Sequence, residues 1–146
     1  MIKILLIGNG AREHVIAETL KKNKEAILYS YIKSKNSGII ALSEGFEVGN
    51  YNDLVKIKNF ARKINPDFAF IGPEEPLSNG VADLFRKLKI SAIGPTKSLA
   101  RLETSKSFTR NLLRKYKIEG NPRFGVFNKN NIGNAKNFIH SLESCV

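Results

Sequence analysis

The segment IKILLIGNGAREH, residues 2–14, indicates the fold most directly. Residues 2–7 form a nearly continuous aliphatic run, which is typical of a strand buried on both faces. Gly8-Asn9-Gly10 ends that run, and residues 12–22 then carry apolar side chains at helical spacing. A buried strand, a glycine turn and a helix in this order predict the first unit of a parallel α/β sheet.

Strand-like and helix-like segments continue to alternate up to Ile93. Further strands are expected at residues 26–32, 45–50, 67–71 and 90–93. Helices are expected from Asn52 or Asp53 to Ile64, and from an N-cap at Ser78 to Leu88. This order predicts a doubly wound, mostly parallel sheet of the Rossmann-like α/β class.

The pattern changes after Thr96. Residues 96–116 carry no strand signal, and their apolar spacing predicts two short helices or one broken helix. A strand is then expected at residues 123–127 and a helix at residues 131–142. This tail is a strand–helix unit without sheet partners, so we expect it to be the least ordered part of the chain.

The composition is that of an ordinary globular protein, with 146 residues, 42% hydrophobic and 25% charged. A formal net charge of +11 favours anionic substrates. The basic residues are spread along the chain among acidic ones, and aromatic residues do not alternate with them as a stacking surface requires. We therefore expect no nucleic-acid partner.

The two ends of the chain bear on where the protein works. The apolar run in residues 1–8 is too short for a signal peptide or a membrane span, so we expect a cytoplasmic protein with no membrane partner. The single Cys145 fits a reducing compartment and offers no disulfide or metal framework. We interpret it as an incidental thiol.

Four breaks in the pattern follow expected strands. They are residues 8–14, 33–38, 72–77 and 94–96. In doubly wound sheets, ligands bind beyond the carboxyl ends of the strands, where the strand order reverses. We therefore expect these four segments to contribute to one site.

The first segment, GNGAREH, combines a glycine turn with a helix start. Such a turn lets the backbone approach a phosphate closely. It differs from a dinucleotide-binding fingerprint, because Glu13 replaces the third glycine and no ribose-binding acid follows about 20 residues on. A tight turn without a ligand stays open as an alternative. Arg12 suits a phosphate or carboxylate, whereas a histidine such as His14 is more often structural than catalytic.

Two later segments carry charged side chains at element ends. In GPEEPL, prolines fix a turn that presents Glu74 and Glu75, which suits an amine or sugar hydroxyls; a solvated acidic turn is the alternative. In ETSKSF, Lys106 lies where a helix begins and suits a nucleotide phosphate; a solvated lysine is the alternative.

Taken together, GNGAREH, KNSG, GPEEPLSNGVAD and IGPTKSLARLETSKSFTR resemble, in order and spacing, the phosphoribosylamine–glycine ligases. These are ATP-grasp enzymes of purine biosynthesis. The resemblance implies a pre-ATP-grasp, substrate-binding domain at residues 1–95, a helical connector at 96–120 and the incomplete start of an ATP-grasp domain at 121–146. It also implies that phosphoribosylamine, glycine and ATP are the substrates.

The same resemblance assigns residues. It implies substrate binding by Gly8, Gly10, Arg12, Glu13, His14, Asn36, Gly72, Pro73, Glu74, Pro76 and Leu77. Glu74 is expected to contact the amino-sugar end of the substrate, and Lys106 a phosphate of ATP. No catalytic residue and no metal ligand is assigned within the chain. The Mg²⁺ ligands and a second nucleotide-binding lysine are expected after Val146, so this chain alone is expected to be inactive.

The chain departs from the family pattern at a few positions. Ala11 stands where glycine is frequent, Ser37 where proline is common, and Glu119-Gly120-Asn121-Pro122 shifts a later landmark. Two other functions are alternatives: a stand-alone binding module for a phosphorylated metabolite, and a nicotinamide enzyme, which the missing ribose-binding acid disfavours.

Overall fold

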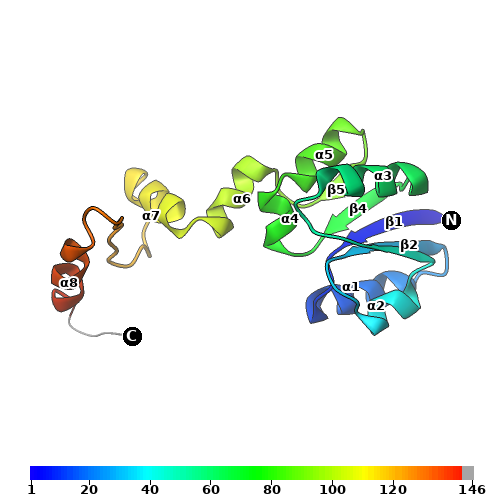
Figure 1. Cartoon of the computed structure of the whole chain (residues 1–146), viewed down its shortest axis with the longest axis horizontal. Helices are drawn as coiled ribbons and strands as arrows, with labels where there is room; N and C mark the ends of the chain where they lie inside the picture. The colour runs from blue at the N-terminus through cyan, green and yellow to red at the C-terminus, as the bar shows by residue number, and fades with distance from the viewer. Residues whose placement is uncertain (143–146) are drawn as a thin grey trace. The chain divides into compact units, whose positions relative to one another are not determined.

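A computed structural model describes residues 1–142, which form two compact units, Met1–Thr104 and the part from Ser105 onward. The first unit is an α/β domain (Figure 1). Its strands are β1 (Ile2–Ile7), β2 (Ala26–Ile32), β3 (Gly45–Val48), β4 (Phe68–Ile71) and β5 (Ser91–Ile93). Its helices are α1 (Ala11–Lys21), α2 (Ser37–Leu42), α3 (Leu54–Ile64), α4 (Glu74–Ser78), α5 (Val81–Lys87) and α6 (Lys97–Thr104).

The five strands form one sheet in the order β3-β2-β1-β4-β5, and every pair is parallel. The chain runs outward from β1 through β2 to β3 and then returns to β4 on the other side of β1. The strand order therefore reverses between β1 and β4, where Ile7 lies opposite Ile71. The doubly wound parallel sheet expected from the sequence is confirmed.

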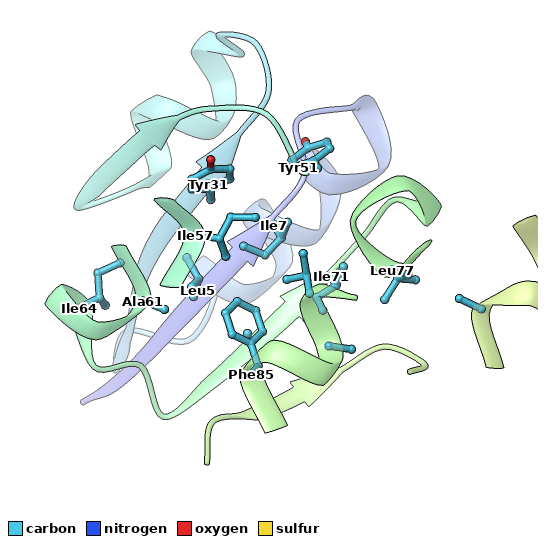
Figure 2. Packing of buried hydrophobic residues seen from close by; sticks show 14 residues of the cluster. Leu5, Ile7, Tyr31, Tyr51, Ile57, Ala61, Ile64, Ile71, Leu77 and Phe85 are labelled. Atoms are coloured by element: carbon cyan, nitrogen blue, oxygen red, sulfur yellow. The ribbon is translucent and has the colours of Figure 1, made fainter. Parts of the chain in front are cut away.

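Alternate residues of β1 face opposite sides of the sheet. Ile4 and Leu6 pack with α1 and α2, whereas Leu5 and Ile7 pack with α3 and α5. Figure 1 shows these two helix pairs on opposite faces, and Figure 2 shows Leu5 and Ile7 beside Ile57 of α3. Burial of such an aliphatic side chain contributes about 1.5–3 kcal/mol. The continuous apolar run of β1 thus serves both cores at once.

One helix start differs from the sequence expectation. Ser78 is the last residue of α4 rather than the N-cap of the next helix, and its hydroxyl donates to the carbonyl of Glu75 at 2.8 Å. Gly80 precedes α5 and has φ +89°, a left-handed conformation that glycine adopts without a steric penalty. The short helix α4 takes up Ser78, and Gly80 then makes the turn between the two helices.

The second unit contains α7 (Lys106–Lys115) and α8 (Gly133–His140). The first lies in the helical region expected at residues 96–116, and the second lies within the helix expected at residues 131–142. The strand expected at residues 123–127 is absent from the described chain. A strand needs a partner for its backbone hydrogen bonds, and the described residues of this unit include no other strand. Side chains hold the segment instead: the Phe127 and Phe138 rings lie 5.8 Å apart, and the Arg114 guanidinium lies 5.0 Å from the Phe124 ring.

Three sequence expectations concern the limits of the molecule. The domain limits at residues 95 and 120 stay predictions; within the first unit, α6 packs against α4 and α5. Cys145 lies outside the described residues. Among residues 1–142, no helix is both long enough and apolar enough to cross a membrane.

Candidate functional site

Asn9 joins three of the loops that follow the carboxyl ends of the strands. Its Nδ2 donates to Ser34 Oγ at 2.8 Å, and its Oδ1 accepts from the Tyr51 hydroxyl at 2.6 Å and from the Lys33 backbone at 3.3 Å. The Asn36 amide donates to the Asn9 carbonyl at 3.0 Å. Asn9 is not among the residues predicted for the site, although a side chain with both a donor and an acceptor between two turn glycines is suited to this role.

Glu13 lies beneath the two turns that flank the reversal of strand order, the β1–α1 turn (residues 8–10) and the β4–α4 turn (residues 72–73). It is only 3% exposed, and its Oε2 accepts the Gly10 N–H at 2.7 Å. A Cβ on Gly72 would come within 2.5 Å of Glu13 Cγ, and one on Gly8 would overlap the same atom. The carboxylate thus fills the place that the third glycine of a dinucleotide fingerprint leaves open, which argues against a nicotinamide cofactor.

His14 and Asn36 are engaged within the protein. The His14 imidazole lies directly over Gly38, where any side chain would overlap it, and its Nε2 is 3.7 Å from Glu18 Oε1. Asn36 is the N-cap of α2, and its Oδ1 accepts the Ile39 N–H at 3.2 Å. These contacts favour the structural interpretation of His14 and place Asn36 at the base of the site. Direct substrate binding by either residue stays a prediction.

Glu74 and Glu75, the adjacent acids at the start of α4, differ in their surroundings. Both Glu75 oxygens accept from Lys33 Nζ, at 2.9 and 2.8 Å, and this ammonium lies 5.9 Å from the Tyr51 ring centroid. Glu74 is exposed and makes no hydrogen bond or ion pair with residues 1–142. The chain therefore neutralises Glu75 itself, whereas the Glu74 carboxylate faces solvent without a partner among residues 1–142.

Arg12 is the exposed cation of the first turn. Its side chain is 71% exposed, and within residues 1–142 it forms an ion pair of 3.7 Å between Nε and Glu13 Oε1. The guanidinium therefore faces solvent with donors to spare, as the binding of a phosphate or carboxylate requires.

Buried residues anchor the segment of residues 72–77. Pro76 and Leu77 belong to it, and Gly94 packs against it. Pro76 and Leu77 are buried in α4, and a Cβ on Gly94 would lie 2.9 Å from a Leu77 methyl group. Gly94 and Thr96 also line a pocket of about 400 Å³ beside α5. Residues 8–14 and 72–77 do not line this pocket. Packing thus places residues 94–96 against residues 72–77. The ligand contacts predicted for residues 8–14 and 72–77 involve individual side chains outside this pocket.

Two buried tyrosines stay protonated at neutral pH. The pKa of Tyr51 is raised to about 12 in total: burial is the largest cause, a hydrogen bond from the Lys33 backbone acts in the opposite direction, and the charges of Glu13 and Glu75 add to the rise. Burial also raises the pKa of Tyr31 to about 12, and the Tyr31 hydroxyl donates to the Asn50 carbonyl at 3.2 Å. Both hydroxyls therefore act as hydrogen-bond donors that hold the loops.

Lys106 belongs to the second unit. It is the first residue of α7, and the Ser105 N-cap accepts the Phe108 N–H at 3.4 Å, so the expected helix start is confirmed. Binding of a nucleotide phosphate by Lys106 stays a prediction. Among residues 1–142, no three His, Cys, Asp or Glu side chains gather into a possible metal site.

Residues 2–103 match the family model described as "Phosphoribosylglycinamide synthetase, N domain". Over 128 residues, or 88% of the chain, the sequence is 51% identical to a phosphoribosylamine–glycine ligase of Methanococcus vannielii, and covers 29% of it. Over 126 residues, or 86% of the chain, it is 52% identical to one of Methanocaldococcus jannaschii, and covers 28% of it. The chain thus spans less than a third of these relatives.

Solved structures share the fold. A phosphoribosylglycinamide synthetase from Anaerococcus prevotii matches 98% of the chain with a TM-score of 0.67 at 15% identity, and 35% of that protein is covered. An N5-carboxyaminoimidazole synthetase from Staphylococcus aureus, complexed with ADP, matches 93% with a TM-score of 0.69 at 16% identity, and 36% of it is covered. At these identities the likeness concerns the fold alone.

Proposed function

Because the chain belongs to the phosphoribosylglycinamide synthetase N-domain family, we propose that it is the N-terminal part of an ATP-dependent carbon–nitrogen ligase. The reaction joins glycine to 5-phosphoribosylamine and gives glycinamide ribonucleotide, ADP and phosphate, as a cytoplasmic step of purine biosynthesis. The names and identities of the relatives support this proposal. The share of each relative that the chain covers supports the view that it is inactive by itself.

The role proposed for this chain is to hold the amino-sugar substrate at the reversal of strand order. The observation that carries the proposal is the contrast between the two adjacent acids, since Glu75 is paired with Lys33 whereas Glu74 has no partner among the described residues. Glu74 then binds the amine of phosphoribosylamine, and the exposed Arg12 binds an anionic group of the substrate.

The other predicted residues complete this site in supporting roles. Gly8, Gly10, Gly72 and Pro73 shape the two turns, Pro76 and Leu77 anchor α4, and Glu13, His14 and Asn36 lie beneath or beside the turns. Lys106 contributes a phosphate contact for ATP at the start of α7. The Mg²⁺ ligands are expected after Val146.

Titration calorimetry of the chain tests the proposal with glycinamide ribonucleotide and NAD as ligands. We expect binding of glycinamide ribonucleotide and none of NAD. Glu74→Gln should weaken that binding about tenfold, because a charge-assisted hydrogen bond is lost. Glu25→Gln, an exposed acid before β2, is the matched control and should leave the affinity unchanged. Binding of NAD without glycinamide ribonucleotide would contradict the proposal.

A further inference from the structure

We propose that Glu13 is a positioning residue, whose buried side chain sets the separation between the β1–α1 turn and the β4–α4 turn. Gly72 is the counterpart that makes room for it. Glu13 and Gly72 act on the substrate through the residues that follow the two turns, Arg12 and Glu74. In this respect the inference rests on the proposed function.

The contacts of Glu13 span both turns. On one side, Oε2 accepts the Gly10 N–H at 2.7 Å, and the Glu13 methylene lies against Gly8. On the other side, Cγ and Oε1 lie so close to Gly72 that an added Cβ would come within 2.5 Å of each. One side chain therefore fills the space between the two strand ends at which the strand order reverses.

The carboxylate itself is out of reach of a ligand. Oε2 is engaged by Gly10, and Oε1 is sealed from solvent and accepts no hydrogen bond from the described residues. A buried carboxylate oxygen without a hydrogen bond is costly. The ion pair with Arg12, at 3.7 Å, offsets this only in part, because its geometry is too long for a hydrogen bond. Glu13 thus acts through the turns, which set the positions of Arg12 at the start of α1 and of Glu74 at the start of α4.

Gly72 allows a sharp test, because its backbone does not itself require glycine. Gly72 is absent from the residues with positive φ, so alanine meets no backbone strain there, and its methyl group would collide only with Glu13 among its closest contacts. Gly8 has φ +140°, so alanine at this position is strained whatever residue 13 is. Removing the Glu13 side chain should therefore relieve Gly72→Ala fully but Gly8→Ala only in part, because the backbone strain and the 2.9 Å approach to Pro73 Cδ would remain at Gly8.

The experiment is a double-mutant cycle with Glu13→Ala and Gly72→Ala, read by the affinity of the chain for glycinamide ribonucleotide. If each single variant loses about tenfold, we expect the double variant to lose about tenfold as well, rather than the hundredfold of independent residues. Glu13→Ala combined with Gly8→Ala is the matched control and should recover clearly less of its loss, because the φ of +140° and the contact with Pro73 remain. Losses that multiply in the Gly72 cycle would overturn the proposal.

Glu13→Gln separates positioning from ligand contact and remains informative if the alanine variants do not fold. Glutamine keeps the volume of the side chain and an acceptor for the Gly10 N–H, so the affinity should stay within about threefold of the unaltered chain. An affinity as low as that of Glu13→Ala, or as low as that of Glu74→Gln, would show that the charge itself serves the ligand and would refute a positioning role.

A second readout keeps this inference distinct from the proposed function. In ¹⁵N spectra of the chain without ligand, Glu13→Ala should shift the amide signals of both Arg12 and Glu74, whereas Glu25→Ala should shift neither. If the unaltered chain failed to bind glycinamide ribonucleotide, the proposed function would fall, and these spectra would still decide whether Glu13 spaces the turns. Shifts confined to residues 10–14 would overturn the inference.

Discussion

Neighbouring residues of the first motif have opposite surroundings. Arg12 faces solvent, while Glu13 is buried beneath the turn and His14 packs over Gly38. The family resemblance implied that all three bind substrate, although the residue type alone favoured a structural role for His14. Which of them faces a ligand depends on the glycines at positions 38 and 72, which lie far away in the sequence, so one motif alone could not separate them.

The same limit explains why the sequence could not distinguish Glu74 from Glu75. Their difference arises from Lys33, which lies 42 residues before Glu75 and reaches it only once β2 and β4 are in one sheet. The sequence did predict that these segments meet, because all parallel strands end at the same edge. It could not predict which acid would be neutralised there.

At the residue scale, the buried tyrosines predict a loss of stability in alkaline solution. The pKa of Tyr51 is raised from 10.0 to about 12 in the folded chain, chiefly by burial, so the unfolded chain releases this proton first. The free energy of unfolding should therefore fall as the pH rises above about 10 and continue to fall up to about 12.

Urea denaturation over this pH range measures the effect. Tyr51→Phe should reduce the slope of stability against pH, because one of the titrating hydroxyls is gone. Tyr116→Phe, at a tyrosine that is 62% exposed, is the control and should keep the slope of the unaltered chain. An equal slope in all three proteins would contradict the assignment.

At the scale of elements, periodicity predicted the first unit well, because its strands are long apolar runs and its helices are amphipathic. The β2 strand has the expected bounds, and α3 begins after Asp53 and ends before Asn65 as its caps predict. The wrong predictions concern positions whose structure depends on a short helix or on a neighbouring strand. Ser78 had a plausible capping pattern but lies in α4, and the apolar residues 123–127 lack a neighbouring strand.

The turn between α4 and α5 gives a prediction at this scale. A Cβ on Gly80 would meet no atom closer than 3.7 Å, so the cost of Gly80→Ala comes from the backbone at φ +89° alone. We expect a loss of about 1–2 kcal/mol in the free energy of unfolding. Gly80→Asn should cost less, because asparagine tolerates this conformation better. Urea denaturation of both variants checks this, and equal losses would argue against a backbone origin.

At the scale of the whole molecule, the family match and the compact first unit nearly coincide. The family model covers residues 2–103, and the first unit ends at Thr104. All substrate-site residues proposed here lie in that unit, whereas Lys106 is in the second. The chain thus divides between an α/β unit that carries the proposed amino-sugar site and a second unit that carries the proposed ATP contact.

Limited proteolysis should reveal this division. Between α7 and α8 the chain runs from residue 116 to 132 without a regular helix or strand, and it carries exposed trypsin sites at Lys117, Arg123 and Lys129. We expect trypsin to cut at these sites before it cuts within residues 1–94, because regular structure resists entry into a protease. Mass spectrometry of the fragments measures the order, and early cleavage within α1 or α3 would contradict it.

The central claim, that the two turns at the reversal of strand order hold the amino-sugar ligand, is tested most directly by ¹⁵N chemical-shift mapping of the chain with glycinamide ribonucleotide. We expect the amide signals of residues 8–14 and 72–77 to shift together and saturably as the ligand is added. In Glu74→Gln, saturation should need about tenfold more ligand. Shifts confined to residues outside these two segments, or no saturable shift at all, would contradict the account.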